Sequence, residues 1–236
     1  MRRIQNLMEQ WLFIGPDNRQ EQVNLPHTWN AKDGQDGGND YYRGTCHYEK
    51  TFEKPEFDPE AEEVYLEFLG VNASSDVTVN GKELAHHDGG YSTFRINITE
   101  VLEDRNKLEV TVDNSVNGKV YPQKADFTFY GGIYRDVRFL IVSKEHFDLD
   151  YLGSNGIKIT PEVKENEANV HIETFTNTEE AQVNVQIKDQ DGKVVAEGNG
   201  CDVNLNIQNP IRWHGRKNPY LYTAVATLTV NGEVKD

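Results

Sequence analysis

Long apolar runs are missing from this sequence of 236 residues. Residues 139–142 are typical of its longest apolar runs, so no segment is predicted to span a membrane. Residues 1–6 have the basic start of a secretory signal, but Glu9 and Asp17 interrupt the apolar stretch that such a signal needs. We therefore expect a cytoplasmic protein without a membrane partner.

Cysteine and basic residues are scarce as well. The two cysteines, Cys46 and Cys201, lie far apart and form no paired framework, so neither a disulfide scaffold nor a thiolate metal site is expected. Lys and Arg total 24 against 39 Asp and Glu, which gives a formal net charge of -15 at pH 7. Such a surface repels phosphate backbones and anionic lipids, which argues against nucleic acid as a partner.

Stretches with helical periodicity are lacking, and short runs of alternating apolar and polar residues take their place. The clearest runs are residues 64–69, 76–79, 107–112, 137–142, 168–175, 181–188, 203–207 and 222–230. Turn signals such as Asn80-Gly81 and Asn231-Gly232 separate them. About a dozen strands at this spacing are typical of β-sandwiches. Only residues 98–103 hint at a helical turn, with Thr99 as its N-cap.

A domain boundary is predicted where the strand signal ends at Val142 and a new alternation begins after Gly156. We predict an all-β protein, with a jelly-roll β-sandwich over residues 1–145 and an immunoglobulin-like β-sandwich over residues 146–236. The chain stops within a hairpin at Asn231-Gly232, so we expect the second domain to be truncated at its C-terminal end.

Five segments stand out, at residues 25–30, 41–52, 79–94, 126–137 and 213–222. In this order they resemble segments of glycoside hydrolase family 2, the family of β-galactosidases, β-glucuronidases and β-mannosidases. The resemblance covers nearly the whole chain. It implies a galactose-binding-domain-like jelly roll and an immunoglobulin-like domain, which in that family precede a catalytic TIM barrel that is absent from this chain.

The resemblance also implies where the chemistry lies. Retaining glycosidases use a nucleophilic carboxylate and an acid/base carboxyl group about 5 Å apart. In this family both are glutamates of the barrel, so we predict no catalytic residue in this chain and no activity of the chain alone. Its expected role is to shape the pocket of a β-galactosidase that hydrolyses terminal β-galactosides by a retaining mechanism. The expected partners are a β-galactoside or related sugar, the TIM barrel, and further copies in a homo-oligomer of the full-length enzyme.

Asp126 is the main candidate for sugar binding. Taken alone, it reads as an acidic turn residue before a strand. The resemblance implies instead that it contacts the terminal sugar, because carboxylates pair well with hydroxyl groups. Asn39 or Asp40 is implied as a second contact, although residues 33–40 by themselves predict a flexible loop that lacks the spacing of a calcium-binding EF-hand. No cofactor or metal is expected in this chain, whereas a monovalent or divalent cation is implied for the full-length enzyme.

Other polar and aromatic residues have structural interpretations. Arg135 is predicted to be a buried or interface arginine bonded to a carboxylate or to carbonyl groups. His86-His87 lacks a carboxylate or third ligand at metal spacing and is interpreted as the end of a surface strand. Four aromatic residues are predicted to pack in the core or at a domain interface rather than to stack on sugars, namely Trp29, Trp213, Tyr220 and Tyr222.

Three other functions remain open. The chain also fits the front end of a β-glucuronidase, a free-standing carbohydrate-binding module, or a structural tandem of sandwiches. The resemblance over both domains and the absence of a recognisable secretion signal favour an enzyme. Tyr134-Arg135-Asp136 favours a β-galactosidase, because β-glucuronidases tend to have His-Arg-Pro there.

Overall fold

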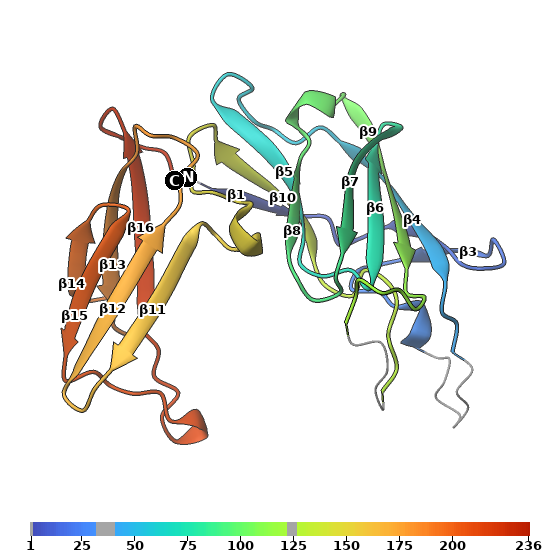
Figure 1. The fold of residues 1–236 in the computed structure, drawn as a ribbon. Coiled ribbons are helices and arrows are strands. Elements are labelled where there is room, and N and C mark those ends of the chain that lie inside the picture. Colours follow the sequence, from blue (N-terminus) through green and yellow to red (C-terminus); the bar gives the residue numbers. More distant parts are fainter. Residues whose placement is uncertain (1, 32–40, 122–126) are drawn as a thin grey trace. The chain divides into compact units, whose positions relative to one another are not determined.

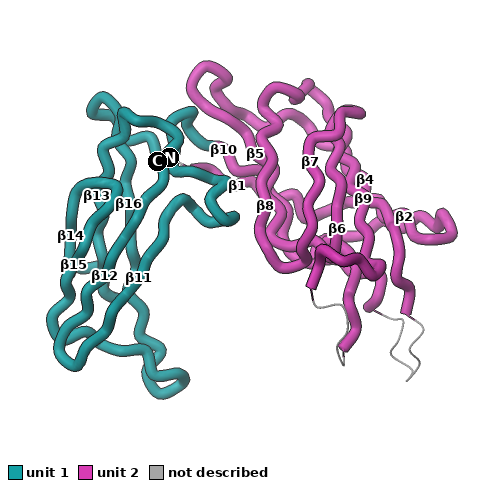
Figure 2. The backbone as a smooth tube through the Cα atoms, in the orientation of Figure 1, with its two compact units in different colours: residues 1, 142–236 teal, residues 2–141 magenta. Residues whose placement is uncertain are grey.

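The computed structural model describes residues 2–31, 41–121 and 127–236, and these form two β-sandwiches (Figures 1 and 2). The first sandwich is the compact unit Arg2–Ile141, and the second is Val142–Asp236. The division lies four residues before the predicted boundary at residue 145. The expected all-β fold is confirmed, since the described helices are single 3-10 turns.

The first sandwich has a four-stranded and a six-stranded sheet. The four-stranded sheet has the order β1 (Arg3–Asn6), β10 (Val137–Ser143), β5 (Glu62–Phe68) and β8 (Phe94–Asn97). The six-stranded sheet has the order β3 (Gln20–Val23), β2 (Trp11–Ile14), β4 (Thr45–Glu53), β9 (Arg105–Asp113), β6 (Ser74–Val79) and β7 (Lys82–Asp88). Alternate residues of β5, β6 and β9 meet in one core, because successive side chains of a strand point to opposite faces.

The second sandwich is built from sheets of three and four strands. The smaller sheet has the order β11 (Ile157–Val163), β12 (Glu167–Thr174) and β15 (Asp202–Gln208). The larger sheet has the order β14 (Val194–Asn199), β13 (Gln182–Lys188), β16 (Thr223–Val230) and β17 (Glu233–Val234). Strict alternation of buried and exposed residues along β15 matches the alternation in its sequence. Each apolar side chain that is fully buried in such a core contributes about 1.5–3 kcal/mol.

The turns follow the sequence signals. Asn80 and Gly81 both have positive φ, as do Asn231 and Gly232, which is the backbone that a two-residue hairpin turn of the right twist requires. The expected helical turn at 98–103 is a 3-10 turn over Thr99–Val101. Thr99 lies inside this turn instead of capping it, and its hydroxyl accepts a hydrogen bond from the Val64 amide at 2.9 Å.

No helix among the described residues is long and apolar enough to cross a membrane.

Candidate functional site

The predicted sugar contacts Asp126, Asn39 and Asp40 all lie outside the described residues. The chain that follows each of them is described, and the two stretches meet. The Phe129 amide donates a hydrogen bond to the Tyr41 hydroxyl at 3.3 Å. The guanidinium carbon of Arg43 lies 4.8 Å from the centre of the Phe129 ring, which is a cation–π distance. Residues 41–44 and 127–134 therefore form one joined surface in the first sandwich.

Two buried asparagines hold these stretches together. The Asn30 side-chain oxygen accepts hydrogen bonds from the Gly131 amide at 2.7 Å and from Asn114 Nδ2 at 3.2 Å. Asn114 Nδ2 also donates to the Phe129 carbonyl at 2.9 Å, and its Oδ1 accepts from the Gly44 amide at 2.9 Å. Both side chains are almost fully buried. A buried asparagine is stable only when its donors and acceptors are satisfied, so these bonds fix the main chain of both stretches.

Gly131 and Gly132 allow this close packing. A Cβ atom on Gly131 would overlap the indole ring of Trp29. Gly132 has a φ of +127°, and a Cβ there would lie 2.6 Å from the His27 carbonyl oxygen. Asn72 and Gly132 exchange two main-chain hydrogen bonds of 3.1 Å. The Gly-Gly pair is thus required by sterics, and it places residues 127–130 against the body of the sandwich.

His27 has a structural part in this arrangement. Its amide donates to the Ile133 carbonyl at 2.8 Å, and its Nδ1 lies 2.8 Å from the Tyr48 hydroxyl. Burial lowers the pKa of His27, and Glu21 opposes this only partly. Burial also raises the pKa of Tyr48. The pair is therefore neutral near pH 7 and serves to hold the segment that contains Gly131 and Gly132.

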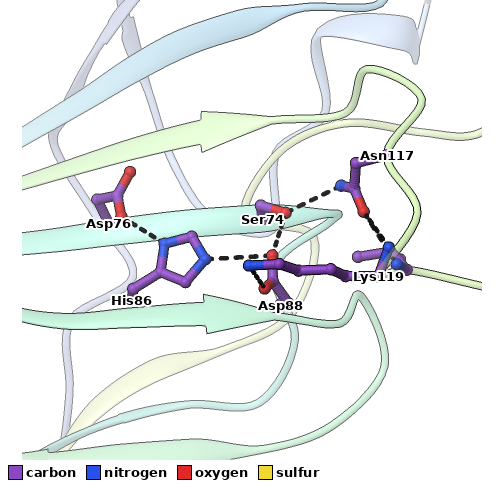
Figure 3. A network of polar contacts seen from close by, with 7 residues as sticks. Ser74, Asp76, His86, Asp88, Asn117 and Lys119 are labelled. Carbon is purple, nitrogen blue, oxygen red and sulfur yellow. Dashed lines mark hydrogen bonds and ion pairs between the residues drawn. The ribbon is translucent and has the colours of Figure 1, made fainter.

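The chain before Asp126 is held by a second network (Figure 3). Ser74 Oγ donates to Asp88 at 2.6 Å and accepts from Asn117 Nδ2 at 3.1 Å. The amides of Lys119 and Val120 both donate to Asn117 Oδ1 at 2.9 Å. The Lys119 ammonium lies 3.1 Å from Asp88. Residues 117–120 are thereby tied to β6 and β7.

The interpretation of His86 needs a correction. Two carboxylates contact it: Nδ1 lies 2.6 Å from Asp76 and Nε2 lies 3.2 Å from Asp88 (Figure 3). Asp88 lies two positions further along β7, and Asp76 lies opposite His86 on the neighbouring strand β6. These hydrogen bonds, with Asp76 first and Asp88 second, raise the pKa of His86. Hydrogen bonds from Ser74, Lys119 and His86 lower the pKa of Asp88 to about 2.

A metal centre is not found in the part of the chain that the structure describes. These residues include no group of three or more His, Cys, Asp or Glu side chains that could hold an ion. The cation that the family resemblance implies belongs to the full-length enzyme and stays a prediction, and no chemical step is assigned to one.

Two further predictions are corrected in part. Arg135 bonds carbonyl groups as expected, those of Leu69 and Tyr91 at 3.4 and 3.3 Å, but it is exposed. The buried arginine is Arg95, whose side chain is 3% exposed. Trp29 packs against the core as expected, whereas Trp213 is 64% exposed.

Comparisons with known proteins identify the family. Residues 38–148 match the family model described as Glycosyl hydrolase 2 galactose-binding domain-like, and residues 155–236 match the model described as Glycosyl hydrolases family 2. The chain belongs to glycoside hydrolase family 2. The first match contains the joined stretches 41–44 and 127–134.

Similar proteins cover the whole chain. A β-glucuronidase from Bacteroides fragilis is 34% identical over 91% of this chain and 33% of its own length. A β-galactosidase from Thermoanaerobacter pseudethanolicus is 28% identical over 100% of this chain and 34% of its own length. The crystal structure of an FMN-binding β-glucuronidase from Facaelibacterium prausnitzii L2-6 has a TM-score of 0.91 and 39% identity, over 100% of this chain and 38% of that one. This chain thus spans about a third of the length of these relatives.

Proposed function

We propose that this chain supplies the accessory domains of a retaining exo-β-glycosidase and lends the substrate pocket one carboxylate, that of Asp126. The observation that carries the proposal is the junction between residues 41–44 and 127–134. The family resemblance implies sugar contacts in residues 33–40 and at Asp126. The stretches that follow these two places are held together by hydrogen bonds. A rigid support of this kind suits a polar group that must meet a sugar hydroxyl in a fixed position.

Two substrate classes have support. β-Glucuronides are favoured by the relatives, among which β-glucuronidase is the commoner name. β-Galactosides are favoured by the Thermoanaerobacter relative and by the Tyr134-Arg135-Asp136 form of the segment after Gly132.

The proposal for the whole enzyme also includes the catalytic carboxyl pair, the TIM barrel that holds it, any cation and the homo-oligomeric state. A cytoplasmic location stays a prediction.

The first test is to read the gene past the codon for Asp236. A following segment with alternating strands and helices and two glutamates at strand ends would support the proposal. A stop codon at that point would contradict it.

The second test is hydrolysis of 4-nitrophenyl β-glucuronide and 4-nitrophenyl β-galactoside by the enzyme that includes this chain. Loss of a charge-assisted hydrogen bond of about 1.5–3 kcal/mol in Asp126→Ala should lower kcat/KM about 10- to 100-fold. Asp191→Ala, in an exposed turn of the second sandwich, is the matched control and should leave the rate unchanged. The 236-residue chain alone should not hydrolyse either compound. If this chain alone hydrolyses either compound faster than buffer does, and Asp126→Ala abolishes that activity, the assignment of catalysis to another part of the enzyme is wrong.

A further inference from the structure

A cavity of about 280 Å³ opens beside the anchored segment of the first sandwich, and four aromatic residues line most of it. Tyr91 comes from the turn between β7 and β8, whereas Phe127, Tyr130 and Tyr134 come from the segment after Asp126. The volume lies just below the usual range of about 300–1,000 Å³ for pockets that bind drug-sized ligands. The cavity therefore suits a ligand of about one ring.

The aromatic rings at this cavity are open to solvent. Tyr91 is 58% exposed, Phe127 is 54% exposed and Tyr130 is 42% exposed. The large aromatic side chains Trp11 and Tyr48 of the same sandwich are fully buried. Three exposed rings around one hollow form a concentrated apolar patch, and such patches mark binding sites.

The rings are held in place from behind. The Tyr91 carbonyl accepts a hydrogen bond from Arg135 at 3.3 Å, and the Tyr134 hydroxyl donates to the carbonyl of neighbouring Gly90. The Tyr130 carbonyl accepts from Asn72 Nδ2 at 2.6 Å. Because these bonds fix the main chain that carries the rings, little ordering remains to be done when a ligand binds.

The remaining lining is polar but uncharged. Thr28, Thr128 and Asn72 complete the described wall, and none of the described lining residues has a charged side chain. Hydroxyl and amide groups around aromatic faces match a sugar ring, which has hydroxyl groups at its edge and apolar C–H groups on its faces. The described lining residues bring no cation to the carboxylate of a uronic acid; the nearby guanidinium of Arg135 bonds the Tyr91 carbonyl, and the net charge of -15 opposes an anionic ligand.

We propose that this cavity is a secondary sugar subsite that binds one neutral pyranose ring, stacked on Tyr91 and Tyr130. The assignment to a sugar rests on the proposed glycosidase function, whereas the binding itself needs neither Asp126 nor the catalytic carboxyl groups. In a substrate, the ring bound in this cavity corresponds to a neutral sugar unit that is joined to the terminal sugar.

Saturation-transfer difference NMR on the 236-residue chain tests this, with methyl β-D-galactopyranoside as the probe. We expect transfer to the carbon-bound ring protons, with a dissociation constant on the order of millimolar because one ring makes few contacts. Tyr91→Ala and Tyr130→Ala should each reduce the transfer several-fold, whereas Tyr91→Phe should keep it. Trp213→Ala, which removes an exposed ring from the second sandwich, is the matched control and should change nothing.

Each opposite outcome overturns the subsite. Equal transfer in Tyr91→Ala and Tyr130→Ala would show that the rings do not bind the sugar. Stronger transfer to methyl β-D-glucuronide, or transfer to phenol with none to the galactoside, would show that the ligand is not a neutral sugar. The role proposed for Asp126 is read in the hydrolysis assay and the subsite in the NMR signal of the tyrosine variants, so the two proposals fail separately. Thermal melting of each variant checks that it is folded.

Discussion

The two sandwiches differ in the number of polar side chains that they bury. Among the residues that the structure describes, the first sandwich buries five polar or charged side chains, namely Asn30, Glu67, Ser75, Asn106 and Asn114. The second buries His146 and Thr174. Both have a continuous apolar core from alternating strands, so the difference lies in the loops and sheet surfaces.

The buried asparagines of the first sandwich serve the main chain of loops. Asn106 bonds the amide and the carbonyl of Glu103 at 2.8 and 2.7 Å, just as Asn114 bonds Gly44 and Phe129. A loop held by buried side chains keeps one conformation, since breaking such a bond leaves polar groups without water or partner. Asn30 and Asn114 thus fix the loops of the candidate site, whereas Asn106 fixes the turn before β9.

The largest effect is expected at Glu67 on β5. Its carboxylate pairs with Arg95 at 2.8 Å and also with Arg138, and its side chain is 2% exposed. Glu67→Ala leaves the buried Arg95 charge without this partner, which should lower the free energy of unfolding of the first sandwich by about 3–5 kcal/mol. Urea unfolding followed by the fluorescence of Trp11 and Trp29 measures this.

The matched control for Glu67 is Glu173→Ala in the second sandwich. Glu173 pairs with Lys158 at 2.5 Å, but both side chains are partly open to solvent. Its removal should have a much smaller effect, because exposed ion pairs contribute little. Equal losses from the two variants would contradict the greater cost expected for the buried ion pair.

An intermediate effect is expected at Asn114. Asn114→Ala removes the partners of the Gly44 amide and the Phe129 carbonyl, and we expect a total loss of about 1–3 kcal/mol. Thr174→Val is the counterpart in the second sandwich, where it removes one hydrogen bond of 3.3 Å and keeps the shape of the side chain, so about 1 kcal/mol or less is expected. Differential scanning calorimetry compares the two. A Thr174→Val loss as large as that of Asn114→Ala would contradict the idea that the asparagines hold the loops.

The sequence predicted the strands that alternate and the turns that need positive φ. It missed β1, whose four residues are all exposed, because the alternation that reports a half-buried strand is absent there. Family resemblance was needed to find the segments on either side of residues 32–40 and 122–126.

The polar contacts of the candidate site could not be predicted from the sequence. Nothing local shows that Asn114 is buried against Asn30, which lies 84 positions away. Glu67 reads as an outward-facing residue of an alternating strand, since its partners Arg95 and Arg138 are 28 and 71 positions away. Local patterns report which face a side chain takes, but not which distant group meets it there.

The smallest effect is expected at His86, where the first sandwich holds a charge at its surface. Its raised pKa arises because both ring nitrogens face carboxylates, and both can donate only when the ring is protonated. Because the pKa of His86 is higher in the folded protein than in the unfolded chain, protonation of His86 stabilises the fold. This stabilisation is complete below the pKa of the unfolded chain, near 6.5, and is lost as the pH rises through the pKa of the folded protein. His86→Gln should therefore lower the melting temperature at pH 5.5 and have less effect at pH 9. The difference should stay below about 1 kcal/mol, because the side chain is 47% exposed.

The control for loss of an exposed histidine is His171→Gln in the second sandwich, where one carboxylate, that of Asp202, lies 2.8 Å away. A loss in His86→Gln that grows with pH would show that Asp76 and Asp88 do not stabilise the protonated ring.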